Sequence, residues 1–150
     1  CAKIGLGAAL PGDDGLIDDM LTQMERQSVD FTQFFRALAA NLKGGADQVT
    51  RLFGDPTGIE DWLTRWADRS KQGSTTPAQQ AAAMNARNPV YIPRNHLIER
   101  ALGLAETGDY AEFQALLDVL KTPFAPQEGR AEYERPAPAD FGAYKTFCGT

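Results

Sequence analysis

The chain has 150 residues, of which 15 are Lys or Arg and 20 are Asp or Glu, so that its formal net charge is −5. A chain of this length buries roughly 70% of its unfolded surface and can form its own core. The acidic balance and the lack of a basic block disfavour nucleic acid and anionic membranes as partners. No apolar run approaches the roughly 18 residues that span a bilayer. Ala and Leu outnumber Val and Ile about fourfold, which favours an all-α fold.

Four pairs of polar residues predict helix starts. In each pair an N-cap acceptor precedes, by three residues, a side chain that can reach back, which is the capping-box spacing. The pairs are Asp30 with Gln33, Thr57 with Glu60, Thr76 with Gln79, and Asp109 with Glu112. Pro77 follows Thr76 at the first helical position, where its missing N–H is not needed.

Apolar residues recur at helical spacing after these starts, and an earlier stripe begins at Leu16. The front stripes, which we interpret as core faces, are Leu16, Ile17, Met20, Leu21 and Met24, then Phe31, Phe34, Phe35, Leu38 and Leu42, then Ile59, Trp62, Leu63 and Trp66. The rear stripes, which predict a helical hairpin, are Leu97, Ile98, Ala101, Leu102 and Ala105, then Tyr110, Phe113, Leu116, Leu117 and Leu120.

The expected architecture is a single helical unit over 1–150, an irregular bundle of about six or seven helices. Front helices over 12–70 are joined by a linker at about 71–76 to back helices over 77–121. From 122 to 150 a proline-rich tail is expected to run extended over the surface. Its expected anchors are Phe124, Tyr133, Phe141, Tyr144 and Phe147.

Cysteine and histidine are too few for the commonest metal sites. Cys1 and Cys148 lie at the two ends of the chain and do not form a disulfide framework. With His96, the single histidine, they cannot fill a four-ligand zinc site of the usual Cys/His kind. We interpret His96 as a solvated imidazole at a helix edge, because a general base needs a proton donor within reach.

Two short acidic patterns resemble metal-binding motifs. Asp13, Asp14, Asp18 and Asp19 have the spacing of magnesium-binding helices, but no second acidic run faces them. We interpret them as acids that favour the positive end of a helix dipole. The tripeptide Asp140-Phe141-Gly142 matches the magnesium-binding tripeptide of kinases, but only eight residues follow it, so we interpret the match as chance. No metal ligand is therefore predicted in this chain.

Cys1 has three possible interpretations. It could be an N-terminal nucleophile, but such enzymes are built on stacked sheets and strand signals are scarce here. It could be the lipidated residue of a lipoprotein, but Ala2 to Leu6 do not look like a flexible tether. The third interpretation, which we prefer, is that Cys1 marks a cut through a longer protein.

A set of short blocks in the second half resembles the C-terminal region of the selenoprotein O family. The blocks are Asn88-Pro89-Val90-Tyr91, Arg94-Asn95-His96-Leu97, Gly108-Asp109-Tyr110, Leu116-Leu117, Leu120, Pro123-Phe124, Tyr133 and Pro136. The front half also resembles the family, through Lys3-Ile4-Gly5-Leu6, Asp13-Asp14, Asp30-Phe31-Thr32 and Phe35-Arg36-Ala37-Leu38. The resemblance spans nearly the whole chain, and its most specific piece is the NP-x-Y-x-x-RN pattern.

The resemblance implies the C-terminal part of a kinase-like protein, described in this family as a pseudokinase. Members transfer AMP from ATP to Ser, Thr or Tyr hydroxyls of proteins, with Mg or Mn. Their nucleotide-binding and metal-binding residues lie upstream of the matched segment, so no catalytic, cofactor-binding or metal-binding residue is expected here. The expected partners are the upstream kinase-like domain and, for the full-length enzyme, protein substrates. This segment alone is expected to be inactive, and its location to be cytoplasmic in bacteria or mitochondrial in a eukaryote.

Cys148 is the one position to which the resemblance assigns a function. From spacing alone we interpret it as an accessible but idle thiol near the chain end, because no neighbouring cation except Lys145 would activate it. Family members carry selenocysteine or cysteine third from the end, which implies a redox role for Cys148. The sequence departs from the family pattern at Pro93, at Phe141 and in its last two residues. The alternative to an adenylyltransferase segment is a free-standing helical module that binds a protein partner.

Overall fold

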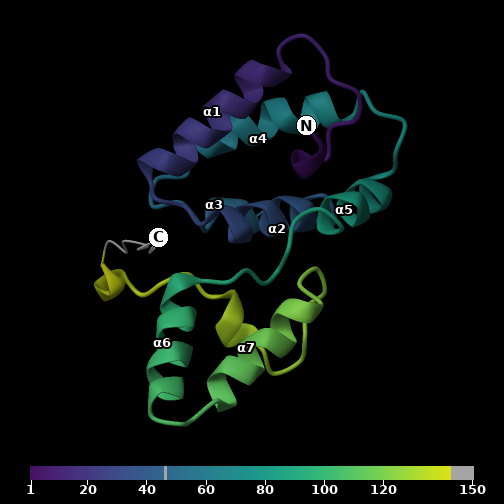
Figure 1. Ribbon diagram of the computed structural model, residues 1–150. Coiled ribbons are helices and arrows are strands. Elements are labelled where there is room, and N and C mark those ends of the chain that lie inside the picture. The colour runs from purple at the N-terminus through teal and green to yellow at the C-terminus, as the bar shows by residue number, and fades with distance from the viewer. Residues whose placement is uncertain (46, 143–150) are drawn as a thin grey trace. The chain divides into compact units, whose positions relative to one another are not determined.

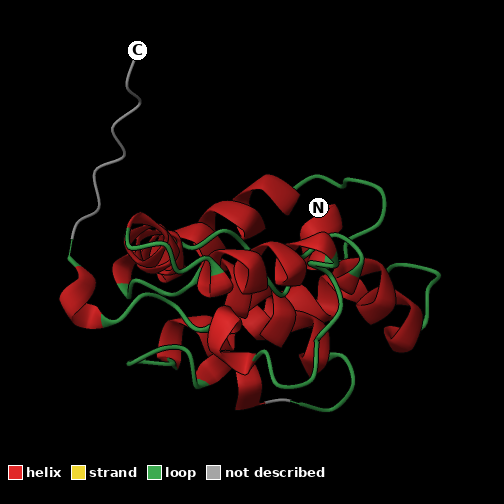
Figure 2. Cartoon of the chain, turned by 60° about the horizontal axis from the view of Figure 1, so that its bottom comes forward, coloured by secondary structure: helices red, strands yellow, loops and turns green. Residues whose placement is uncertain are grey.

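A computed structural model describes residues 1–45 and 47–142. Its internal contacts divide the chain into two compact units, Cys1–Val90 and Tyr91–Thr150. Within the described residues all regular structure is helical, as the absence of strand colour in Figure 2 shows. The predicted all-α class is therefore confirmed. No helix in the described part of the chain is both long enough and apolar enough to cross a membrane.

The described residues of the first unit form five α-helices and a short N-terminal 3-10 turn, which can be followed in Figure 1. The elements are η1 (Ala2–Ile4), α1 (Asp13–Arg26), α2 (Phe31–Asn41), α3 (Asp47–Thr50), α4 (Thr57–Ser70) and α5 (Pro77–Asn85). α1 packs along α4, while α2 packs against α3, α5 and η1. Residues 71–76, the expected linker, connect α4 to α5 inside this unit.

Up to residue 142, the second unit is a helical hairpin followed by short turns. Helices α6 (Asn95–Glu106) and α7 (Ala111–Lys121) pack against each other, as the rear stripes predict. The chain between them reverses at Gly108, which has a φ of 89° that glycine adopts at little cost. Beyond α7 the described chain forms two 3-10 turns, η2 (Ala131–Glu134) and η3 (Ala139–Phe141).

The predicted helix entrances are all present, although two of them use a different cap. The Asp30 carboxylate accepts from the Gln33 N–H, and Thr76 forms a complete capping box with Gln79. The caps predicted at Thr57 and Asp109 are wrong. Thr57 is already helical, and its N–H donates to the Asp55 carboxylate; Asp109 lies one residue before the cap position and accepts from the Ala111 N–H. In both cases the acidic side chain closes a turn before the helix instead of capping it.

The core of the first unit contains an aromatic cluster contributed mainly by α2 and α4. Phe34 and Trp62 are fully buried, and their ring centroids lie 6.0 Å apart. Trp62 and Trp66 stack at the same distance with an interplanar angle of 12°. The front stripes are thus confirmed as core faces, except that Leu21 is 37% and Phe31 is 55% exposed. Both exceptions lie on one side of the unit.

The hairpin of the second unit buries only part of its two stripes. Leu97, Ala101 and Leu116 are buried, but Leu102, Phe113 and Leu117 are exposed, because the two helices cover only one side of each other. Among the expected tail anchors, Tyr133 is buried, whereas Phe124 is 47% exposed. Tyr144 and Phe147 lie outside the described residues.

Candidate functional site

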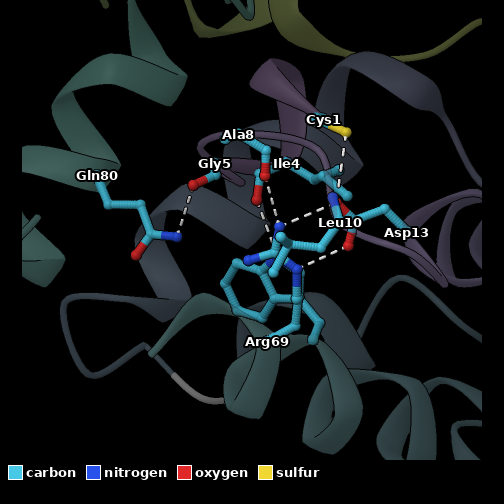
Figure 3. Close-up of polar contacts among 9 residues, drawn as sticks. Cys1, Ile4, Gly5, Ala8, Leu10, Asp13, Arg69 and Gln80 are labelled. Carbon is cyan, nitrogen blue, oxygen red and sulfur yellow. Dashed lines mark hydrogen bonds and ion pairs between the residues drawn. The ribbon is translucent and has the colours of Figure 1, made fainter. Parts of the chain in front are cut away.

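The N-terminal segment before α1 is held by side chains of α4 and α5 (Figure 3). Trp66 Nε1 donates to the Ile4 carbonyl at 2.8 Å, and Gln80 Nε2 donates to the Gly5 carbonyl at 2.9 Å. Ile4 and Trp66 are almost fully buried, so neither the Ile4 carbonyl nor the Trp66 indole N–H can bond to water. The hydrogen bond between them satisfies both groups. The segment is therefore fixed in place by backbone recognition.

We call the hydrogen bonds from Trp66 and Gln80 to the N-terminal segment the clasp. An ion pair next to the clasp connects the segment to α1. Asp13 is 3% exposed, and its carboxylate accepts from Arg69 Nε at 2.7 Å, from Arg69 Nη2 at 2.9 Å and from the Leu10 N–H at 2.9 Å. Arg69 Nη2 also donates to the Ala8 carbonyl at 2.8 Å. The hydrogen bonds from Arg69 and Leu10 lower the pKa of Asp13, so that its carboxylate is ionised and paired. This geometry locks the entrance of α1 against the last turn of α4.

The rest of the acidic run does not gather into a metal site. Asp19 Oδ2 lies 2.8 Å from Arg65 Nη1, a pairing between exposed side chains of α1 and α4. Asp14 and Asp18 are exposed. The described residues contain no group of three or more His, Cys, Asp or Glu side chains that could hold a metal ion. Asp13 and Asp19 instead form ion pairs with arginines of α4.

Cys1 is exposed, and its thiol lies next to the same ion pair. Cys1 Sγ is 3.8 Å from Asp13 Oδ2, as Figure 3 shows. A nucleophilic cysteine is activated by a cation or a base at this position. The neighbour here is the Asp13 carboxylate, which is paired with Arg69 and has a lowered pKa, so it is a poor base for activating the thiol.

The NP-x-Y-x-x-RN block contributes buried hydrogen-bonding groups to both units. In the first unit Asn88 is 1% exposed; its Nδ2 donates to the Lys3 carbonyl at 2.8 Å, and its carbonyl accepts from Arg36 Nη1 at 3.4 Å. In the second unit the hydroxyl of Tyr91 accepts from the Gln127 N–H at 2.8 Å.

Arg94 of the same block fixes the chain that follows α7. The side chain is buried, and its Nη2 donates to the Glu134 carbonyl at 2.9 Å. Tyr91 N–H also donates to the Pro123 carbonyl at 3.2 Å. The most specific piece of the family resemblance is therefore used for structural contacts.

His96 lies near the start of α6, as predicted, but its imidazole is half-buried and not fully solvated. The His96 ring packs against Phe141 with centroids 5.8 Å apart, and burial together with the charges of Arg94 and Arg100 lowers its pKa. Asp140 is exposed on η3. Neither residue belongs to a cluster of catalytic groups in the described chain.

The redox candidate Cys148 lies outside the described residues. Sequence reasoning placed Trp66 on a core face but missed its hydrogen bond to the N-terminal segment, and it missed Arg69 and Gln80 altogether. Burial of a tryptophan implies a partner for its N–H, and that signal was available for Trp66. No signal pointed to the Arg69–Asp13 pair, because its partners lie on helices far apart in the sequence.

Comparison with known proteins places these features in one family. The family model described as "Protein adenylyltransferase SelO" matches residues 1–121. The proteins named "Protein nucleotidyltransferase YdiU" are similar along almost the entire chain. The Sphingopyxis alaskensis protein is 45% identical over 148 residues, which are 99% of this chain and 30% of the relative. The Mycobacterium sp. KMS protein is 43% identical over 150 residues, with the same coverages.

A third relative, from Rhodopseudomonas palustris, is 43% identical over 152 residues, covering 99% of this chain and 31% of its own length. The chain thus spans about 30% of the length of these curated relatives. Since the family model matches well over half of the chain and the resemblance noted from the sequence agrees with it, the chain belongs to the SelO family of nucleotidyltransferases.

Proposed function

We propose that this chain is the C-terminal helical part of a protein adenylyltransferase. The full-length protein would transfer AMP from ATP to Ser, Thr or Tyr hydroxyls of other proteins. The part described here would support the kinase-like catalytic part upstream, and alone it would be inactive. The observation that carries the proposal is the family match, which extends over residues 1–121 while the chain covers only about 30% of its relatives.

The contacts of the NP-x-Y-x-x-RN block favour a structural role for this segment. Asn88, Tyr91 and Arg94 are buried and hydrogen-bonded to carbonyls, amides or side chains of their own unit. Because the side chains of these three residues are engaged in contacts within the protein, they stabilise the fold and are not available to bind a nucleotide. The first unit adds a clasp that fixes its N-terminal segment, which suits a body that must hold a fixed position next to another part of the same chain.

The proposed reaction needs ATP and a divalent cation, and the acidic residues of this chain do not fit the cation. Hard cations such as Mg²⁺ take several oxygen ligands in one place. Here Asp13 is occupied by Arg69 and Asp19 by Arg65. We therefore propose that ATP and Mg or Mn bind to the part of the full-length protein outside this chain.

The reaction itself defines the test. A protein hydroxyl oxygen bonds to the α-phosphorus of ATP, the bond from that phosphorus to the bridging oxygen breaks, pyrophosphate leaves and the hydroxyl proton is released. Full-length protein incubated with ATP labelled at the α-phosphate is expected to label protein, whereas ATP labelled at the γ-phosphate is not. Labelling by residues 1–150 alone would contradict the division of labour, and γ-label transfer would contradict the reaction.

For Cys148 we propose a redox role in the full-length protein. Its thiol would form a disulfide with a cysteine of the catalytic part, each thiol losing a proton and the pair giving two electrons to a thiol oxidant such as diamide. On a non-reducing gel, full-length protein treated with diamide is expected to shift, and Cys148→Ser to abolish the shift, while Cys1→Ser retains it. A shift that persists in Cys148→Ser would remove the proposal.

A helical interaction module remains the competing function, and one observation favours it. Leu102, Phe113 and Leu117 expose apolar surface on the hairpin of the second unit, as a protein-binding face does. A module would bind a partner and leave α-labelled ATP untouched in the full-length protein. We further propose a cytoplasmic location, since the relatives compared are bacterial; recovery of the protein in the membrane or periplasmic fraction would contradict it.

A further inference from the structure

Residues 1–6 have the hydrogen bonds of a helix C-terminus. The Leu6 N–H donates to the Cys1 carbonyl at 3.1 Å, and the Gly5 N–H donates to the Ala2 carbonyl at 3.3 Å. Gly5 is left-handed, with φ 73° and ψ 10°. This pair of bonds around a left-handed glycine is the Schellman motif, which ends α-helices.

The helix that this motif should end is almost absent, because η1 has only three residues. A single turn fixes several backbone dihedrals for one hydrogen bond and is unfavourable by itself. Here the clasp by Trp66 and Gln80 holds the turn in place. The Schellman motif at Gly5 and the hydrogen bonds that hold η1 in place are the features expected at the last turn of a longer helix.

An apolar groove lies beside this turn. Its volume is about 390 Å³, and its lining includes Ile4 of η1, Ile17, Met20 and Leu21 of α1, and Phe31 and Phe35 of α2. Leu21 and Phe31 are the two members of the front stripes that the unit leaves exposed. Cys1 also lines the groove, so any residue bonded to its nitrogen starts at the groove's edge.

We propose that the residues directly before Cys1 form a helix that ends at Gly5 and fills this groove with its apolar face. The inference rests on the proposed function, in which this chain continues upstream. Counting back from Ile4 at helical spacing, the groove side would carry Cys1, the residue directly before it and the fourth residue before it.

The covalent link favours this occupant over a second copy or a free ligand. A segment joined directly to Cys1 has an effective concentration of millimolar or more at the groove. The relatives are about three times as long as the matched region, so a long stretch of chain remains to be placed. A second copy would have to compete with that segment at the groove's own edge.

Alkylation of paired cysteine variants tests whether the groove is filled. Leu21 lines the groove and is 37% exposed, while Leu10 lies outside it and is 43% exposed, which makes a matched control. In full-length protein, Leu21→Cys is expected to react with a maleimide at least tenfold more slowly than Leu10→Cys, as followed by peptide mass spectrometry. Equal rates, in variants whose circular dichroism matches the parent, would overturn the proposal.

Photocrosslinking then identifies the occupant. Benzoylphenylalanine placed at position 31 of the full-length protein is expected to crosslink within the ten or so residues before Cys1. A crosslink to a second copy, to a distant part of the chain or to no peptide would overturn the proposal. Neither readout depends on AMP transfer, so an inactive protein with a filled groove would count against the proposed function alone, and an active protein with an open groove against this inference alone.

Discussion

Replacement of Trp66 by phenylalanine tests whether the clasp positions the N-terminal turn. Trp66 is 1% exposed, and its Nε1 donates to the Ile4 carbonyl at 2.8 Å. Phenylalanine keeps an aromatic ring but leaves the buried carbonyl without this donor, which costs about 1–3 kcal/mol. The smaller ring leaves a void of the order of 40 Å³, which adds about 1 kcal/mol at roughly 24 cal/mol per Å³. The free energy of unfolding should therefore fall by about 2–4 kcal/mol.

Trp62→Phe is the matched control. Trp62 is equally buried and stacks on Trp66, but its Nε1 donates to the Leu16 carbonyl in α1, at 2.7 Å. Urea unfolding followed by circular dichroism should show a similar loss for both variants. Hydrogen exchange should separate them: the amides of Gly5 and Leu6 should lose protection in Trp66→Phe and keep it in Trp62→Phe under native conditions.

Two results would refute this reasoning. A loss below about 0.5 kcal/mol for Trp66→Phe would mean that the Ile4 carbonyl finds another partner at no cost. Unchanged protection of the Gly5 and Leu6 amides would mean that the turn is held without the indole. In the second case the Schellman motif would be stable through its own backbone bonds, and the clasp would act only on global stability.

Three further predictions concern single residues. Gly5→Ala should lower thermal stability, since a left-handed alanine costs roughly 1–2 kcal/mol and its Cβ would lie 2.7 Å from Met84 Sδ; an unchanged melting temperature would contradict the positive φ. Thr76→Ala should cost about 1 kcal/mol in urea unfolding through loss of the capping box, whereas Thr76→Ser should cost little; equal losses for the two would contradict the cap. Because the folded-state pKa of Asp13 lies below its ordinary value of 3.8, its stabilisation is complete above that pH and is lost as the pH falls through the lowered pKa. Asp13→Asn should accordingly flatten the acid limb of stability against pH, and an identical limb would show that the carboxylate does not contribute.

Periodicity predicted the fold well where a helix packs on one side only. Leu16, Met20 and Met24 repeat at three to four residues and are buried as predicted. The same rule fails at Leu21 and Phe31, because apolar spacing marks a face that needs a partner and does not show whether that partner lies in the same chain. Both exceptions line the same apolar groove, the one that we propose is filled by the residues before Cys1.

The contacts that fix the N-terminal segment could not be predicted, for a different reason. In the sequence, Asp13 and Arg69 resemble ordinary surface charges. Asp13 lies in the first turn of α1 and Arg69 in the last turn of α4, where each charge is favourable to the helix dipole. Only the packing of α1 on α4 brings them together, with Arg69 Nε 2.7 Å from Asp13 Oδ1. Whether two residues far apart in the sequence meet depends on how their helices cross. The spacing of residues along a single helix does not show that crossing.

The residues of the NP-x-Y-x-x-RN block carry the family resemblance, and the structure shows which contacts the same residues make. The NP-x-Y-x-x-RN block identified the family, yet the structure gives Asn88 and Arg94 buried contacts within their own units. Residues that carry a family resemblance can therefore be residues that form buried contacts within their own unit. Asn88 Nδ2 donates to the Lys3 carbonyl, inside the turn that ends at Gly5. The block thus contacts the turn at which the proposed upstream helix would end, and its role there would be to hold that turn in register.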